Sequence, residues 1–130
     1  MAAILLIDDE PQLRSALRRA LERVGHSVLE AGDGEEGLRT VSKNLVDLVI
    51  TDIIMPGVDG IELIVQLLEH HPGLPIIAMS GGGAHLPSDL VLSDARGLGA
   101  IISISKPFEV SDLLLAVNAA LTSKRNIREA

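Results

Sequence analysis

Short apolar runs alternate with segments of helical period along the whole of this chain. The apolar runs cover residues 3–7, 28–29, 48–51, 75–79 and 100–105. Each run is followed by a segment in which apolar residues recur at helical spacing. Strands that are apolar on both faces are typical of a parallel sheet covered by helices. The pattern therefore predicts an α/β fold of five β-α units, with a doubly wound parallel sheet of five strands in the favoured order 2-1-3-4-5.

The predicted helices begin and end at residues with suitable chemistry. Pro11 suits the first turn of the first helix, and Gly25 suits its end. A second helix is expected from about Gly34, and a third covers 61–69 before the sequence His70-His71-Pro72-Gly73. A fourth is expected over 90–98 and a fifth over 110–121. We predict one domain over residues 1–122, followed by a polar tail or the start of a linker at 123–130.

Composition limits the classes of function that the chain can serve. A hydrophobic fraction of 47% in 130 residues is enough for a well-filled core. The net charge of −7 disfavours direct contact with nucleic acids and anionic membranes. Zero cysteines exclude disulfides and suit a reducing compartment. The acids that follow the first apolar run indicate a strand and not a signal peptide, and no apolar stretch reaches the roughly 20 residues of a membrane span. We expect a soluble, cytoplasmic protein.

Charged residues stand directly after three of the apolar runs. Asp8 and Asp9 follow the first run, Asp52 follows the third, and Lys106 follows the fifth. The predicted strand order places strands 1 and 3 side by side at the switch point, where ligands bind beyond the carboxyl ends of the strands. At an effective dielectric of about 20, two carboxylates ~5 Å apart repel each other by roughly 3 kcal/mol. Mg²⁺ would relieve that repulsion, and Lys106 would offer a point charge to a phosphoryl oxygen.

These motifs resemble the receiver domain of two-component response regulators. The resemblance spans residues 3–122 and rests on four motifs in order: Ile7-Asp8-Asp9-Glu10-Pro11; Asp52 with Met55-Pro56-Gly57-Val58-Asp59-Gly60; Ser80-Gly81; and Lys106-Pro107-Phe108. It implies the flavodoxin-like (βα)5 fold. It also implies that Asp52 is the phosphoacceptor and that Mg²⁺ is held by Asp9, by Asp52, by Asp8 mainly through water, and by the backbone carbonyl of Ile54.

The resemblance further assigns the phosphoryl oxygens to Ser80, Gly81 and Lys106, with Ser80 and Lys106 assisting the transfer to Asp52. A cis peptide bond often precedes the proline that matches Pro107. The implied function is Mg²⁺-dependent transfer of a phosphoryl group to Asp52 from a sensor histidine kinase or a histidine phosphotransfer protein. Such a domain is no enzyme beyond its own phosphorylation and dephosphorylation. Phosphorylation would switch the face made by the fourth helix, fifth strand and fifth helix, for an output domain or a downstream protein.

Two departures from the family pattern affect how the signal is read out. The family usually carries an aromatic residue at the position of Ser103, whose ring swings inward on activation. The stretch between Ser80 and Lys106 is also longer than typical, with an insert near Gly83-Ala84-His85-Leu86-Pro87. The triple glycine after Ser80 leaves the backbone unusually free. We therefore expect phosphorylation to order residues 81–88 and to reposition the fourth helix.

Other interpretations of the same residues are weaker. A Mg²⁺-dependent aspartyl-phosphate phosphatase of a related fold is the main alternative, but it needs a second acid at the position of Ile54. A receiver-like binding module would lack one of the site residues, and none is missing. The sequence Gly32-Asp33-Gly34-Glu35-Glu36-Gly37 matches a dinucleotide-binding pattern, but its three acids would repel a pyrophosphate, so it predicts a turn and a helix start. His70 and His71 point apart on a helix and are expected to be solvated.

Overall fold

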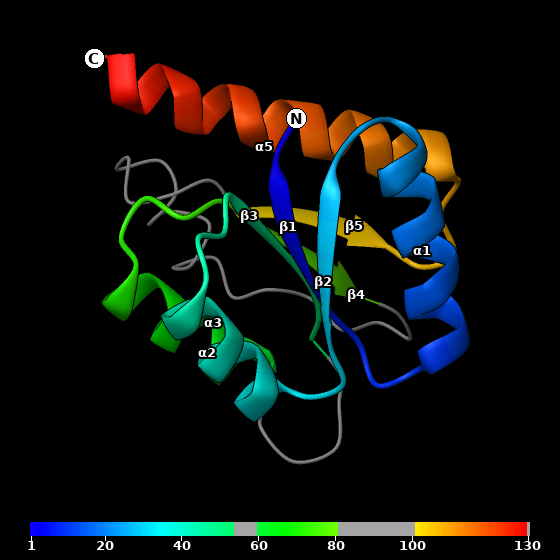
Figure 1. The fold of residues 1–130 in the computed structure, drawn as a ribbon, viewed down its shortest axis with the longest axis horizontal. Coiled ribbons are helices and arrows are strands. Elements are labelled where there is room, and N and C mark those ends of the chain that lie inside the picture. Colours follow the sequence, from blue (N-terminus) through cyan, green and yellow to red (C-terminus); the bar gives the residue numbers. More distant parts are fainter. Residues whose placement is uncertain (54–59, 81–100, 130) are drawn as a thin grey trace.

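Five parallel strands form a single sheet in the order β2-β1-β3-β4-β5 in the computed structural model (Figure 1). The strands are β1 (Ala3–Ile7), β2 (Ser27–Ala31), β3 (Leu48–Asp52), β4 (Ile76–Ser80) and β5 (Ile101–Ser105). The structure describes residues 1–53, 60–80 and 101–129, with the backbone alone for Ser80, Ile101 and 123–129. The fold class and the strand order predicted from the sequence are confirmed.

The described helices cover both faces of the sheet. They are α1 (Pro11–Arg23), α2 (Gly34–Lys43), α3 (Gly60–His70) and α5 (Val110–Glu129). Figure 1 shows α1 and α5 on one face and α2 and α3 on the other. The helix expected over 90–98 lies outside the described residues. Within the described residues, no helix combines the length and the apolar character that crossing a bilayer would take.

Helix α5 extends further than its apolar pattern predicts. Apolar spacing predicted an end at Leu121, whereas the helix continues to Glu129, through the segment in which we expected a tail or linker. Lysine, arginine, glutamate and alanine are good helix formers, and they are frequent in this segment. Helical propensity therefore carries α5 beyond the end of its apolar pattern.

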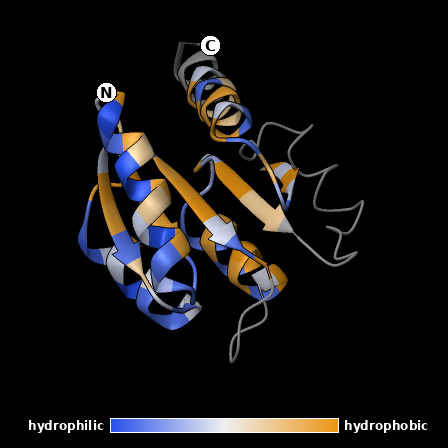
Figure 2. Cartoon of the chain, turned by 90° about the vertical axis from the view of Figure 1, so that its right-hand side faces the viewer, coloured by the Kyte–Doolittle hydropathy of each residue, from blue (hydrophilic) through white to orange (hydrophobic). Residues whose placement is uncertain are grey.

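The sheet is buried on both faces at its centre. In β1, Ile4 and Leu6 pack in the core beneath α1 and α5, while Leu5 and Ile7 pack in the core beneath α2 and α3. All four side chains are fully buried. In Figure 2 the strands are mostly orange, and α1 alternates between blue and orange as expected for a helix with one buried face.

The two edge strands are less apolar than the inner ones. In β2, Ser27 and Leu29 are exposed and Glu30 is half-buried. In β5, Ser103 and Ser105 are exposed. The expectation of strands that are apolar on both faces is therefore wrong at the edges, because an edge strand lacks a neighbour on one side and is covered less completely.

Local contacts fix how α2 and α3 begin. Asp33 caps α2 by accepting a hydrogen bond from the Glu36 backbone N–H (2.8 Å), and the Glu36 side chain accepts one from the Gly32 N–H (3.2 Å). This segment is the turn and helix start that the sequence predicted. At the start of α3, a Cβ atom on Gly60 would overlap the backbone of Ile53. The close approach seats α3 directly against the residue that follows Asp52.

Candidate functional site

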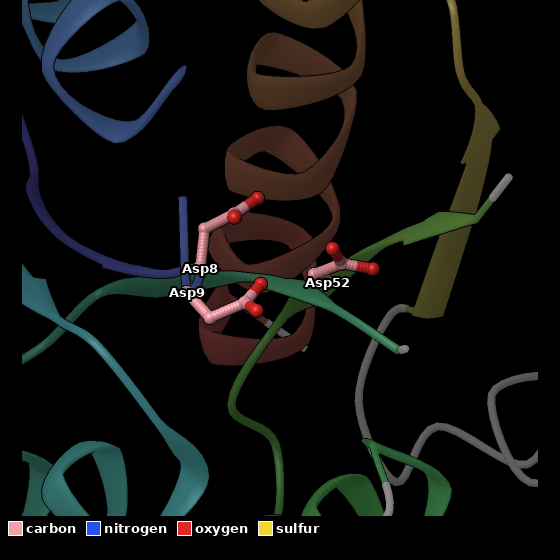
Figure 3. Close-up of side chains that lie close together, drawn as sticks. All are labelled: Asp8, Asp9 and Asp52. Atoms are coloured by element: carbon pink, nitrogen blue, oxygen red, sulfur yellow. The ribbon is translucent and has the colours of Figure 1, made fainter. Parts of the chain in front are cut away.

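Three carboxylates meet where β1 and β3 end. Asp8 and Asp9 follow β1, and Asp52 is the last residue of the neighbouring β3, which pairs with β1 in parallel register from Ile4 with Leu48. One carboxylate oxygen from each aspartate lies within 4.8 Å of the others. In Figure 3 the side chains of Asp8 and Asp9 extend toward the side on which Asp52 lies. The predicted convergence of these acids is confirmed.

Asp8 is the most enclosed of the three, and its polar groups are all engaged. The side chain is fully buried. Its Oδ1 accepts a hydrogen bond from the backbone N–H of Glu10 (2.9 Å), and its backbone N–H donates to the carbonyl of Ala31 (3.1 Å). Its carbonyl oxygen accepts a hydrogen bond from Arg14 Nη1 (2.6 Å). Hydrogen bonds therefore hold both the backbone and the side chain of Asp8 in place.

Burial, hydrogen bonding and the neighbouring charges together shift the pKa of Asp8. Burial raises the pKa of the Asp8 carboxyl above its ordinary value, and the negative charge of Asp52 adds to this. The hydrogen bond from Glu10 and the positive charge of Lys106 act in the opposite direction without cancelling the rise. Burial is the main cause of the raised pKa, and the smaller contribution of Asp52 means that the two carboxylates repel each other across the site.

Among the described residues, Lys106 is the cation that pairs with the cluster. Its Nζ lies 3.0 Å from Asp52 Oδ2 and 3.5 Å from Asp8 Oδ2. Burial lowers the pKa of Lys106, but the hydrogen bond to Asp52 and the charges of Asp8 and Asp52 outweigh this effect and raise the pKa overall. Lys106 is thus held as an ammonium ion at the carboxylate pair. The peptide bond between Lys106 and Pro107 is cis, as the family resemblance implied.

The residues of the cluster fit a small, hard cation. Three carboxylates face one ammonium group, and carboxylate oxygens are the preferred ligands of Mg²⁺. Asp52 is only 6% exposed, whereas Asp9 is exposed at the surface. The cluster therefore has one buried side, which holds its geometry, and one side that an ion or a phosphoryl group can reach.

The other residues predicted for the site are described in part. Ser80 ends β4 and pairs with Ser105, so its backbone lies at the same sheet edge as Lys106. Ile54, Gly81 and the loop 81–88 lie outside the described residues. Ser103, which replaces the family's usual aromatic residue, is exposed on β5.

Two residues near the site were missed at the sequence level. Arg14, in the first turn of α1, contacts both the backbone of Asp8 and the side chain of Glu30. The sequence holds a signal for this contact, because Glu30 is a charged residue directly beside the short apolar run at 28–29. We limited the second strand to that run, whereas β2 extends over Ser27–Ala31 and includes Glu30.

Comparisons with known proteins agree with this geometry. Residues 4–118 match the family described as response regulator receiver domain. The C4-dicarboxylate transport transcriptional regulatory protein DctD of Pseudomonas aeruginosa is 40% identical over 97% of this chain, which spans 26% of that protein. Response regulator GtcR of Aneurinibacillus migulanus is 39% identical over 91% of this chain and 47% of its own length. The chain thus spans about a quarter to a half of these curated relatives.

Solved structures give the same result. A response regulator receiver domain protein from Clostridium thermocellum superimposes with a TM-score of 0.83 at 31% identity, covering 98% of this chain and 99% of that one. NtrX from Brucella abortus, in complex with ATP, superimposes with a TM-score of 0.84 at 32% identity, covering 98% of this chain and 28% of that one. Neither match favours the phosphatase alternative. The chain belongs to the response regulator receiver domain family, the phosphoaccepting domains of two-component signalling.

Proposed function

We propose that Asp52 is the residue of this domain that accepts the phosphoryl group. The main observation is that its carboxylate is nearly buried, lies within 4.8 Å of two other carboxylates and is paired with an ammonium group at 3.0 Å. The donor would be the phosphohistidine of a sensor histidine kinase or of a histidine phosphotransfer protein, which this domain would meet in the cytoplasm. A carboxylate oxygen of Asp52 attacks phosphorus, the N–P bond breaks, and its electron pair stays on the imidazole of the donor.

The neighbouring residues would prepare Asp52 for this attack. Lys106 holds one carboxylate oxygen of Asp52 and would pair with a phosphoryl oxygen once the group has arrived. Asp8, Asp9 and Asp52 would hold Mg²⁺ together with the backbone carbonyl of Ile54, and that ion supplies positive charge against the phosphoryl oxygens. The hydroxyl of Ser80 and the backbone of Gly81 complete the proposed phosphoryl site.

A groove beside the site suggests where the phosphodonor binds. It has a volume of about 520 Å³ and lies between α1 and the segment that follows β5. Its lining is apolar except for one residue: Leu13, Ala16, Leu17, Lys106, Pro107, Phe108 and Val110. Because Lys106 joins the groove to Asp52, a partner helix lying there could bring its phosphohistidine to the carboxylate. We propose that the output leaves over the remaining face, made by β5, α5 and the expected fourth helix.

Labelling with a small phosphodonor tests the nucleophile. With acetyl phosphate and Mg²⁺, the wild-type protein is expected to gain one hydroxylamine-labile phosphoryl group. Asp52→Asn should abolish it, because an amide is no nucleophile for this transfer. Asp33→Asn, a change at an exposed helix cap, should label normally. A phosphoryl group that persists on the Asp52→Asn protein would disprove the assignment.

The groove is tested by comparing two phosphodonors. Ala16 is exposed within the groove, so Ala16→Glu places a charge there without filling the core. Transfer from a phosphorylated histidine kinase should slow by about 10-fold, since a charge at the centre of an apolar contact is costly. Labelling by acetyl phosphate should stay within about 2-fold of wild type. If both donors slow equally, the change acts on the site itself and the groove is not the docking surface.

A further inference from the structure

Arg14 joins the acidic cluster to the edge strand β2. It lies in the first turn of α1, where its backbone N–H donates to the carbonyl of Glu10 (3.0 Å). Its Nη1 donates to the carbonyl oxygen of Asp8 (2.6 Å), and its Nε donates to Glu30 Oε1 (2.8 Å). One guanidinium group therefore bridges two segments that are far apart in the sequence.

The carbonyl that Arg14 binds belongs to the peptide unit that leads into Asp9. A peptide unit is planar, so fixing the direction of the Asp8 carbonyl also fixes the plane that carries the Asp9 N–H. The Asp9 side chain is exposed, and we find no hydrogen bond to its carboxylate from residues 1–53, 60–80 or 101–129. The orientation of the backbone is thus what directs Asp9 toward Asp8 and Asp52.

Arg14 is itself held in place by an ion-pair network. Glu30 accepts hydrogen bonds from Arg14 and, through its other oxygen, from Arg18 Nη1 (2.8 Å). The side chains of Arg14 and Glu30 are 20% and 26% exposed, so the pair is partly shielded from water. Glu30 also offsets the charge of Arg14, so the guanidinium can hold the Asp8 carbonyl with little repulsion of a cation nearby.

We propose that Arg14 is a positioning residue for the divalent cation site. It holds the peptide between Asp8 and Asp9 in the orientation that lets both carboxylates face Asp52, and it does not contact the ion. This inference rests on the proposed function, in which Asp8, Asp9 and Asp52 bind Mg²⁺. It goes beyond that proposal by assigning part of the ion affinity to a residue on α1 and to its partner on β2.

Calorimetric titration of the full chain with Mg²⁺ tests the assignment. Arg14→Met removes every donor but keeps a long side chain with good helix propensity. Its dissociation constant for Mg²⁺ should rise about 10-fold, the lower end for losing a group that orients a metal ligand. Arg18→Met is the matched control, because Arg18 also pairs with Glu30 but has no contact with Asp8. It should change the dissociation constant by less than about 2-fold.

A second variant separates geometry from charge. Arg14→Lys keeps the positive charge but replaces the planar fork by a compact ammonium, which is poorly placed to serve the Asp8 carbonyl and Glu30 together. The proposal expects Mg²⁺ affinity weakened about as much as in Arg14→Met. Wild-type affinity in Arg14→Lys would overturn it, because charge alone would then suffice. If Arg14→Met does not fold, Arg14→Lys carries the comparison.

Kinetics of labelling by acetyl phosphate provide an independent readout. In Arg14→Lys the Mg²⁺ concentration at half-maximal rate should rise about 10-fold. The rate at saturating Mg²⁺ should stay within about 2-fold of wild type, because Arg14 does not touch the reacting groups. A purely structural role for Arg14 would lower the maximal rate and leave the half-saturating concentration unchanged.

The Asp9→Asn protein shows which proposal fails. If it binds Mg²⁺ as tightly as wild type, the cation site itself is wrong and the role of Arg14 is overturned with it. If Asp9→Asn loses Mg²⁺ while both Arg14 variants bind normally, the cation site stands and only the role of Arg14 is overturned. Loss in Asp9→Asn together with the 10-fold loss in Arg14→Lys supports both.

Discussion

Asp8 and Glu30 are carboxyl groups at the ends of neighbouring strands, yet their pKa values shift in opposite directions. Burial raises the pKa of Asp8, which is fully buried. The hydrogen bond from Arg18 lowers the pKa of Glu30, burial opposes this, and the hydrogen bond from Arg14 lowers the pKa further. Both acids form ion pairs, so the presence of a salt bridge alone does not predict the direction of the shift.

The difference lies in the ratio of acids to bases and in the access of water. At the ends of β1 and β3, within the part of the chain that the structure describes, Asp8 and Asp52 share the ammonium of Lys106, and Asp9 adds a third negative charge nearby. At β2, the single carboxylate of Glu30 is shared by two guanidinium groups. The first cluster has negative charge left over for a ligand, and the second is satisfied within the protein. Arg14 contacts both clusters, and in its proposed role it would let the second cluster support cation binding by the first.

Removing the cation of the first cluster is expected to have the largest effect. Lys106→Met leaves Asp8 and Asp52 buried and close together with no ammonium group between them. In EDTA, the free energy of unfolding should fall by about 3 kcal/mol, the lower end for breaking a buried pair, since Lys106 keeps some exposure. Urea denaturation followed by circular dichroism measures this change. Saturating Mg²⁺ should restore part of the loss, because the ion replaces the missing charge.

Arg18→Met is the matched change in the second cluster. It also removes one cation from a carboxylate, but Glu30 keeps Arg14 as a partner and is partly exposed. We expect a loss below about 1 kcal/mol. Equal losses in the Lys106 and Arg18 variants would mean that the two clusters do not differ in the way described above.

Removing the acids is expected to change stability in opposite directions. In EDTA, Asp8→Asn should raise the free energy of unfolding by about 1–2 kcal/mol, because it relieves repulsion with Asp52 and the cost of burying a charge. Glu30→Gln should lower it by about 1 kcal/mol, because two guanidinium groups lose their partner. Both effects can be read from urea denaturation at neutral pH. A fall in stability for Asp8→Asn would show that Lys106 and Glu10 fully compensate its charge.

The same contrast predicts two opposite dependences on pH. Asp8 has a folded-state pKa above its ordinary 3.8, so the native state binds the extra proton, and its contribution is lost as pH rises through that raised pKa. Glu30 has a folded-state pKa below its ordinary 4.5, so its contribution is present above that value and is lost as pH falls. Between acidic and neutral pH in EDTA, wild type should therefore lose stability relative to Asp8→Asn and gain it relative to Glu30→Gln. The measurement is the free energy of unfolding of each protein as a function of pH. If the differences from wild type changed with pH in the same direction for both variants, the opposite pKa shifts of Asp8 and Glu30 would be contradicted.

The sequence predicted the acidic cluster because its parts depend only on strand ends. Asp8, Asp9, Asp52 and Lys106 each follow an apolar run, and a parallel sheet brings the carboxyl ends of its strands to one edge. The order of the strands then follows from the few topologies that right-handed crossovers allow. Neither step needs the orientation of a helix, so pattern alone was sufficient.

The contacts of Arg14 were not predictable in that way. They depend on how the first turn of α1 is rotated about its axis and on where β2 ends, and apolar spacing reports neither. The apolar run at 28–29 is shorter than β2, because an edge strand tolerates polar residues such as Ser27 and Glu30. The extension of α5 to Glu129 was missed for a related reason, since helical propensity outlasts the apolar pattern.

The smallest effect is expected at the outer end of the second cluster, where Arg18 Nε also pairs with Glu22 Oε2 at 3.2 Å. The two side chains are 40% and 44% exposed and lie one helical turn apart, so water and salt screen the pair. Glu22→Gln should lower the free energy of unfolding by less than about 0.5 kcal/mol and should leave Mg²⁺ affinity unchanged in calorimetry. Glu30 remains available to Arg18 in this variant, so Arg14 keeps its own partner and its contact with Asp8. A clear loss of Mg²⁺ affinity in Glu22→Gln would show that a change at the exposed Arg18–Glu22 pair reaches Arg14 through Glu30. The ion pairs of Glu30 with Arg14 and Arg18 would then not be enough to hold Arg14 in place.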